Sequence, residues 1–310
     1  MSLAAKLPWT HRFAGGFSGI GSQPLPTDAD AIDYLARVKA ADGAGVEVGV
    51  ATAVDAFIRD AKELGVFSAL KACCILAGSR TLAGALVPVV GDAPTNVANG
   101  FVNGDFSRTA GLTGDGATTY LDSGRAADAD GQDDVHLSRY LTAAGTVAGF
   151  EVHIGARRTS GGGDLASTQI GYSQGSVFNF LCARNEAQRV DVSGPQYTGF
   201  AGVTRSVNTE IDARINGSNS SAASTSESPP SIPYYVFARN QGGSTTGPSN
   251  ATIAFYSIGT SLSLEDLDTA VTNLINRLKF ALLVGENPSG LDPASINYIV
   301  SGYENGSTLQ

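Results

Sequence analysis

The earliest regular pattern of apolar positions in the chain has the period of an α-helix. Thr27 or Asp28 can cap such a helix, because either side chain can accept a hydrogen bond from a free backbone N–H in the first turn. The helix carries Ile32, Leu35 and Val38 on one side, at the spacing of a buried stripe. The pattern therefore predicts a first helix that packs through this side.

A second stripe of the same period follows after two glycines. Its spacing predicts a helix that packs against the next part of the chain or against a sister subunit. Gly65 stands where helices commonly end in the left-handed conformation, and Phe67 and Leu70 begin a further short turn. The stripe consists of Val50, Val54, Phe57, Ile58, Ala61 and Leu64.

From Cys73 to about Ile258 the apolar runs become short and often alternate with polar residues. Such runs, separated by Gly, Asn, Pro and Ser, are typical of strands joined by turns. Many short strands at regular spacing predict an antiparallel β-sandwich. The runs are CCILAG, TTYLDSG, VHLSRYL, FEVHIGA, SVFNFLCA, EIDARING, YYVFARN and ATIAFYSIG.

A last helical pattern begins at the capping box formed by Ser263 and Asp266 and continues to about residue 284. The fold class predicted is therefore mainly β, with an N-terminal helical region and a C-terminal helix. The chain divides into an extended N-terminal arm (1–26), a helical attachment region (27–72), a β-sandwich domain with its C-terminal helix (73–284) and a tail (285–310).

The N-terminal arm contains isolated aromatic residues but no helical or strand period. A segment with so little local pattern is expected to become ordered against a binding surface, where Trp9, Phe13 and Phe17 offer apolar anchors. Packing of the arm on its own domain is the alternative. The sequence predicts that these three residues bind a partner.

The stretch GLTGDGATTYLDSG, residues 111–124, combines three glycines with two aspartates. A phosphate-binding loop needs a helix directly after its glycines. Here the residues from Thr118 to Leu121 are β-branched, aromatic or aliphatic, which favours a strand. The stretch therefore predicts a turn that leads into a strand, with Tyr120 and Leu121 on the strand and Leu121 pointing into the core.

Composition narrows the classes of function. A net charge of −9 over 310 residues argues against general binding to nucleic acid or to anionic membranes, because both need a basic surface. The three cysteines include the adjacent pair Cys73 and Cys74 and have the spacing of neither a zinc site nor a disulfide framework. Free thiols fit assembly in a reducing cytoplasm, and no signal peptide or membrane-spanning run is recognisable.

Three segments resemble segments of virion proteins of tailed phages, including cyanophages and marine phages. They are, in chain order, CCILAGSRTLAGALVPVVGDAPTN, GLTGDGATTYLDSG and IAFYSIGTSLSLEDL. Those proteins are similar in pattern to concanavalin-like jelly-roll sandwiches. The resemblance covers roughly residues 28–283 and implies a structural virion component, assembled in the host cytoplasm.

The resemblance leaves two places on the particle open. A capsid decoration or cement protein would bind the major capsid protein through its N-terminal part and project the sandwich outward. A tail or fibre protein would instead contact tail components and bind a host surface glycan. A homo-oligomer is expected in either case. An aromatic groove for a glycan would be lined by Tyr172, Tyr197, Tyr234 and Tyr235.

One motif has the form of a catalytic site. GYSQG, residues 171–175, matches the G-x-S-x-G nucleophile elbow of α/β-hydrolases and is similar to the version in cutinases. An elbow needs a helix after its serine and a histidine later in the chain. Strand-like residues follow Ser173, and the histidines His11, His136 and His153 all precede it. A hairpin turn is predicted instead.

Acidic residues give two further candidates. Glu151 and His153 can share one face of a strand with Arg157 further along, but no second acid completes a glycosidase pair, so Glu151 is predicted to lie on the solvent face of its strand. The acidic loop DADGQDD, residues 128–134, does not match the spacing of an EF-hand, which leaves a solvated loop or an irregular calcium site. The sequence thus predicts a protein that is not an enzyme, with no cofactor and no metal site.

Overall fold

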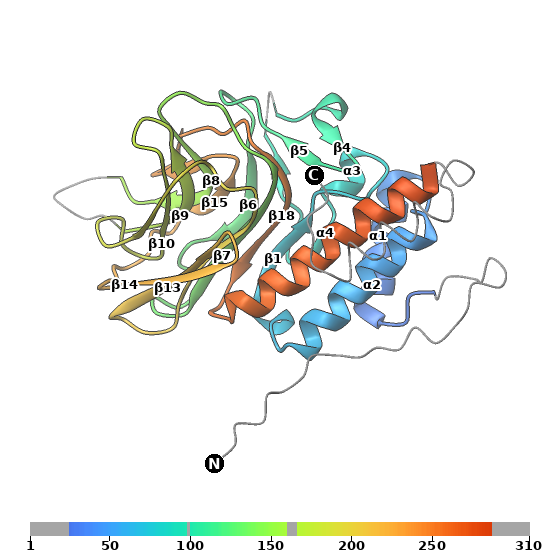
Figure 1. Cartoon of the computed structure of the whole chain (residues 1–310), viewed down its shortest axis with the longest axis horizontal. Helices are drawn as coiled ribbons and strands as arrows, with labels where there is room; N and C mark the ends of the chain where they lie inside the picture. The colour runs from blue at the N-terminus through green and yellow to red at the C-terminus, as the bar shows by residue number, and fades with distance from the viewer. Residues whose placement is uncertain (1–24, 98–99, 160–165, 287–310) are drawn as a thin grey trace, which may run out of the picture.

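The predicted short strands form two packed antiparallel sheets, which confirms the β-sandwich, and a layer of helices covers one of them (Figure 1). The computed structural model describes residues 25–97, 100–159 and 166–286. Within these residues each sheet has nine strands. The strand pairs are antiparallel except for β16 beside β8.

Sheet A is the middle layer and has the strand order β14-β13-β12-β7-β18-β1-β2, with β5 beside β18 and β4 beside β5. Strand β18 lies between β7 and β1, so two long strands flank it. The strands are β1 (Leu70–Ile75), β2 (Pro88–Val90), β4 (Phe106–Ser107), β5 (Gly111–Thr113), β7 (Val135–Ala143), β12 (Gly199–Arg205), β13 (Glu210–Ile215), β14 (Ser218–Ala223) and β18 (Thr252–Gly259).

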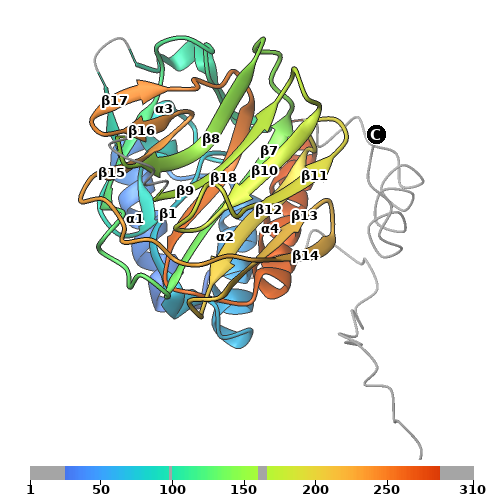
Figure 2. The ribbon, with the colours of Figure 1, turned by 90° about the vertical axis from the view of Figure 1, so that its left-hand side faces the viewer.

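Sheet B is the outer layer, and Figure 2 looks onto it. Its strand order is β11-β10-β9-β8-β15-β6-β3, with β16 paired to β8 and β17 paired to β16. The strands are β3 (Thr95–Asn96), β6 (Leu121–Ala126), β8 (Phe150–Arg157), β9 (Ser167–Ser173), β10 (Phe178–Cys182), β11 (Val190–Ser193), β15 (Pro233–Val236), β16 (Arg239–Gln241) and β17 (Ser244–Thr246).

The helices are arranged so that three of them lie on sheet A (Figure 1). Helix α1 begins at the cap Asp28, which accepts the backbone N–H groups of Asp30 and Ala31, and it ends at Gly43 with φ 74°. Helix α2 ends before Gly65, whose φ of 75° confirms the predicted stop. The helices are α1 (Ala29–Asp42), α2 (Val48–Glu63), α3 (Leu82–Ala85) and α4 (Leu264–Glu286), with 3-10 turns at Phe67–Ala69 and Asn103–Asp105.

The buried side of α1 matches the predicted one at Val38 and in part at Leu35, but not at Ile32. Ala31, Tyr34 and Val38 are buried, whereas Ile32 is 50% exposed. The prediction counted aliphatic residues alone, but a small alanine allows close packing and a tyrosine buries a large apolar ring. The stripe predicted for α2 is buried apart from its last residue, Leu64.

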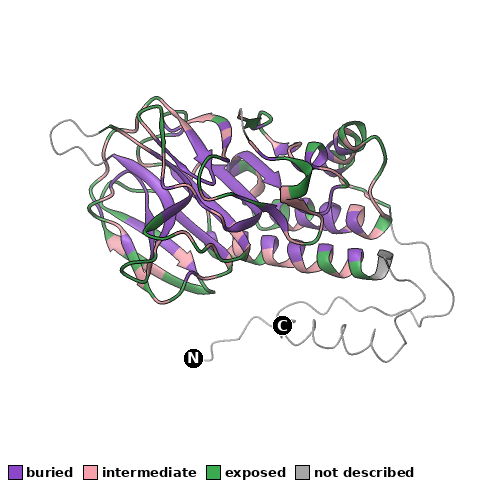
Figure 3. Ribbon diagram, turned by 90° about the horizontal axis from the view of Figure 1, so that it is seen from above, coloured by how far each residue is buried: buried purple, intermediate pink, exposed green. Residues whose placement is uncertain are grey.

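Two hydrophobic cores share sheet A (Figure 3). In the central strand β18, Ile253, Tyr256 and Ile258 face the core between the sheets, and Phe255 faces the helices. Since side chains alternate along a strand, a strand buried on both faces reads as a nearly continuous apolar run. The run ATIAFYSIG has this character, and every residue of β18 is buried.

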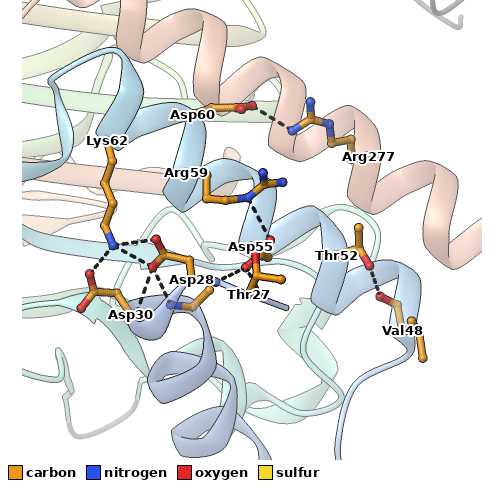
Figure 4. Close-up of polar contacts among 11 residues, drawn as sticks. Thr27, Asp28, Asp30, Val48, Thr52, Asp55, Arg59, Asp60, Lys62 and Arg277 are labelled. Carbon is orange, nitrogen blue, oxygen red and sulfur yellow. Dashed lines mark hydrogen bonds and ion pairs between the residues drawn. The ribbon is translucent and has the colours of Figure 1, made fainter. Parts of the chain in front are cut away.

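Polar contacts fix the start of α1 on α2 (Figure 4). The backbone N–H groups of Thr27 and Asp28 both donate to Asp55 Oδ1, over 2.7 and 2.8 Å. Arg277 of α4 donates to Asp60 of α2 at 2.9 Å. Because Asp55 itself is buried, these bonds determine where the chain enters the helical layer.

A buried histidine on the helix-facing side of sheet A makes stability depend on pH. His136 is completely buried; its Nδ1 lies 2.6 Å from the Thr260 carbonyl oxygen and its Nε2 2.9 Å from Ser257 Oγ. Nδ1–H therefore donates to Thr260, and Nε2 accepts from the Ser257 hydroxyl. Burial lowers the pKa of His136 to about 4.

We expect this histidine to make the protein sensitive to acid. Between about pH 6.5 and 4 the unfolded chain binds the proton that the folded chain excludes, so stability falls as the pH decreases, by up to about 3 kcal/mol. Urea unfolding of the native protein and of His136→Gln, at pH values of about 7, 5.5 and 4.5, measures the slope. A slope equally steep in the variant would contradict the assignment.

Candidate functional site

A groove on the outer face of sheet B collects aromatic and basic side chains. Its volume is about 240 Å³, smaller than the pockets that hold drug-sized ligands. Strands β8, β9, β10 and β16 and the loop after β10 supply its walls. The lining residues are Phe150, Arg157, Gln169, Ser173, Phe178, Phe180, Glu186, Arg189 and Arg239.

Strand alternation places these side chains on the outer face. Ile170 of β9 and Leu181 of β10 point into the core between the sheets. Their neighbours along each strand must then point outward, which brings Phe178 and Phe180 onto the same face. The spacing of two residues between these phenylalanines thus gives β10 an aromatic side toward the groove.

A glycine forms part of the floor. The strand pair β9–β10 brings Gly171 opposite Phe180. A Cβ atom at Gly171 would lie 2.3 Å from Cζ of Phe180, so the ring lies directly over this glycine. Phe150 completes the aromatic lining, and 40% of it remains exposed. The groove therefore offers an accessible apolar surface next to a ring that is held in place.

Two arginines stack against these rings. The Arg189 guanidinium lies 5.3 and 5.4 Å from the ring centroids of Phe178 and Phe180, and that of Arg239 lies 5.2 Å from Phe150. Arg239 also donates hydrogen bonds to Thr246, Gln169 and Gln241, which hold it in one orientation. Cation–π contacts of this kind hold the guanidinium group next to the rings, and the group keeps its positive charge.

The groove contains more positive than negative charge. Its single lining carboxylate, Glu186, lies 2.8 Å from Arg157 Nε and 3.7 Å from Arg239 Nη1. Arg189 is paired outside the lining with Asp191. Burial lowers the pKa of Arg239 and the neighbouring Glu186 opposes that shift, while an arginine stays ionised in proteins. Arg157 and Arg239 thus share one carboxylate, whereas Arg189 has a separate partner.

The four predicted glycan-binding tyrosines do not line this groove. Tyr234 is enclosed in the core between the sheets, where its hydroxyl accepts from Arg184. Tyr235 packs against Tyr120, with ring centroids 4.4 Å apart. Tyr172 is buried, and the Tyr197 hydroxyl donates to the Ser193 carbonyl oxygen. The structure therefore does not bring the four rings together on an exposed surface.

The GYSQG motif is a hairpin, as predicted. Ser173 ends β9, a turn follows, and Phe178 begins β10. The described histidines have other partners, since His136 contacts Thr260 and Ser257 and His153 contacts Gln196. Ser173 lines one side of the groove and ends a strand, but it has neither the following helix nor the histidine that an elbow requires.

Glu151 and His153 do lie together, but both are buried, so the prediction that Glu151 faces solvent is wrong. Gln196 Nε2 donates to Glu151 Oε1 at 2.7 Å and also contacts His153 Nε2, and Ser249 donates to the other carboxylate oxygen. A register shift in β8 between Val152 and Ile154 interrupts the regular alternation. Arg157 consequently lines the outer groove, whereas Glu151 and His153 do not.

The acidic loop at residues 128–134 is organised around an arginine. The Arg184 guanidinium donates to the backbone carbonyl oxygens of Ala127, Asp130 and Gly131 over 2.7, 3.1 and 2.9 Å, and to that of Gln132 over 3.3 Å. These carbonyls therefore already have a cation at their centre. The described parts of the chain contain no cluster of three or more metal-ligating side chains.

The glycine-rich stretch at residues 111–124 is a turn before a strand, as predicted. Asp115 Oδ1 accepts the backbone N–H groups of Ala117, Thr118 and Thr119, and Gly116 has φ 71°. No helix follows these glycines, so the phosphate-loop alternative is wrong. Leu121 begins β6 and points into the core, whereas Tyr120 precedes the strand.

The predicted partner-binding residues Trp9, Phe13 and Phe17 lie outside the described residues.

Among the helices in the described part of the chain, none is both long and apolar enough to cross a membrane.

No protein-family model matches the chain, and no curated protein matches it significantly. Among solved structures, the Trypanosoma rangeli sialidase is similar with a TM-score of 0.47 and 12% identity, covering 73% of this chain and 39% of that one. The NanB sialidase from Streptococcus pneumoniae has a TM-score of 0.39 and 13% identity, covering 52% and 27%. The CBM40 domain of the Ruminococcus gnavus IT-sialidase, bound to α2,3-sialyllactose, has a TM-score of 0.34 and 9% identity, covering 44% and 80%.

This chain covers 26% of the leech trans-sialidase and 27% of NanB, so it matches only part of each enzyme. TM-scores between 0.34 and 0.47 are too low to support a functional argument.

Proposed function

We propose that the chain is a structural virion protein of a tailed phage whose sandwich binds carbohydrate in the groove on sheet B. The observation that carries the carbohydrate part is the gathering of three phenylalanines and several polar side chains around one small open groove. Sugar rings present apolar C–H faces between hydroxyl groups, so they fit a surface in which aromatic rings alternate with hydrogen-bonding groups.

Glu186 and Gln169 are groove residues that can form hydrogen bonds with sugar hydroxyl groups. A carboxylate accepts hydrogen bonds from hydroxyl groups, and an amide both donates and accepts them. Both residues line the groove next to the phenylalanines. The groove is therefore suited to a single sugar unit, or to part of a longer glycan that extends along the sheet.

The three resembling segments support the virion part of the proposal. We propose capsid decoration as the place on the particle, with attachment through the N-terminal part, and a tail or fibre position as the alternative. Mass spectrometry and imaging of intact particles distinguish the two. Labelled protein at the head surface supports decoration, whereas label at the tail supports the alternative and its absence from particles refutes both.

Replacing Phe150 by alanine is expected to weaken carbohydrate binding about tenfold. The change removes an exposed ring from the groove, and loss of its contact with a sugar corresponds to about 1.5 kcal/mol. Affinity electrophoresis in gels that contain extracted bacterial surface polysaccharides measures the effect.

The control is Leu283→Ala, which removes an exposed apolar side chain from α4, away from sheet B. This variant is expected to migrate as the native protein does. Native protein that no polysaccharide retards, or equal retardation of native protein and Phe150→Ala, would refute the proposed site.

A further inference from the structure

We infer that the groove recognises an acidic sugar, one that carries a carboxylate or sulfate group, and that Arg157 is the residue that binds this group. The inference rests on the proposed carbohydrate-binding function and specifies its ligand class. It follows from the state of the Arg157 side chain, from the charge of the groove and from the placement of the phenylalanines.

The Arg157 guanidinium has unused hydrogen-bonding capacity. Its Nε pairs with Glu186 Oε2 over 2.8 Å, but its terminal nitrogens donate to none of the described residues. Only 17% of the side chain is exposed. A guanidinium this far removed from water is stabilised by acceptors, and a carboxylate or sulfate can accept two parallel N–H bonds from it.

The charge balance of the lining favours an anion. Arg157 and Arg239 share the carboxylate of Glu186, and Arg189 is paired with Asp191, so one guanidinium charge is left in excess. Electrostatic attraction is stronger in a partly buried groove than in bulk water, so the surplus positive charge attracts an acidic group. The whole protein carries a net charge of −9, which makes this local excess of arginine stand out from its surroundings.

The aromatic residues distinguish a sugar from a small inorganic anion. Phe178 and Phe180 lie beside Arg189, and Phe150 lies beside Arg239. A ligand that spans from Arg157 to these rings must combine an acidic group with an apolar face. An acidic sugar has both, whereas a free phosphate or sulfate ion has only the charge.

Removing the charge of Glu186 should strengthen the binding of an acidic sugar, the opposite of what removing Arg157 should do. The Glu186 carboxylate competes with a ligand anion for Arg157 and repels that anion. Glu186→Gln keeps the size of the side chain and removes the charge. We expect this variant to bind acidic glycans more tightly than the native protein, by about threefold or more.

The decisive experiment uses an array of oligosaccharides in matched neutral, carboxylated and sulfated forms. The native protein should bind acidic forms in preference to their neutral counterparts, and Arg157→Gln should weaken that binding tenfold or more. The carboxylated and sulfated members separate the two acidic groups. Arg158→Gln is the matched control, since Arg158 donates to the Ser228 carbonyl oxygen and is outside the groove lining.

The binding results for these variants show separately whether the groove binds carbohydrate and whether it prefers acidic sugars. Acidic binding that is lost in Arg157→Gln, kept in Arg158→Gln and increased in Glu186→Gln supports the inference. Equal binding of neutral and acidic forms refutes it and leaves carbohydrate binding intact. Binding of no glycan refutes both, and so distinguishes failure of the function from failure of the ligand class.

Discussion

Replacing Arg184 by methionine is expected to lower the free energy of unfolding by about 4 kcal/mol. The arginine is buried and donates to four backbone carbonyl oxygens, three in the acidic loop and one at Ala127 just before it. Methionine has similar length but no donor, so the substitution leaves these carbonyls without their partner, at about 1–3 kcal/mol for each that remains buried. Chemical denaturation at neutral pH measures the change.

Arg37→Met provides the control. Arg37 is a half-buried arginine of α1 that donates to a single backbone carbonyl, that of Pro88, and pairs with Asp33 on the same helix. Its loss should cost no more than about 1 kcal/mol, because water can replace both contacts. If Arg184→Met cost equally little, the guanidinium would not be what organises the acidic loop.

Gly111→Ala is expected to destabilise the protein by about 3 kcal/mol or more. Gly111 begins β5 with φ 108°, a conformation that residues with a side chain rarely adopt. A Cβ atom there would lie 2.3 Å from the Ile253 carbonyl oxygen and 2.8 Å from Cα of Ala254. Backbone strain and overpacking each cost about 1–3 kcal/mol, and both act at this position.

Gly104→Ala is the control, because it makes the same substitution at a position where neither backbone strain nor overpacking is expected. A Cβ atom at Gly104 would have nothing within 4 Å, and its φ is not positive. We expect its thermal midpoint to remain within a few degrees of the native value. Equal losses in the two variants would mean that the contact of β5 with β18 is not the cause.

Local signals in the sequence predicted much of the fold. The cap at Asp28, the stop at Gly65 and the turn around Gly116 involve residues close together in the chain, and each was confirmed. The choice of buried side on α1 depends instead on what packs against it. Ile32 is the most hydrophobic residue of that helix, yet Ala31 and Tyr34 contact the rest of the protein.

The groove was not predicted because its residues come together only when sheet B forms. Arg157, Arg189 and Arg239 lie on separate strands and loops, and nothing in their sequence neighbourhoods sets them apart. The pair Phe178 and Phe180 was the available signal, since two aromatic residues at strand spacing must share a face. The tyrosines were chosen instead because they are aromatic, without regard to the face on which each would lie.

The helices lie on one face of sheet A and sheet B lies on the other, so the two ends of this stack of layers present different surfaces. Residues 25–28 join the helical layer, where Asp55 accepts the backbone N–H groups of Thr27 and Asp28, and sheet B lies on the other side of sheet A (Figure 1). The groove lies on the face of sheet B that points away from sheet A. Both sheets lie between these two places. A surface that held the protein through its N-terminal side would therefore leave the groove facing away from it.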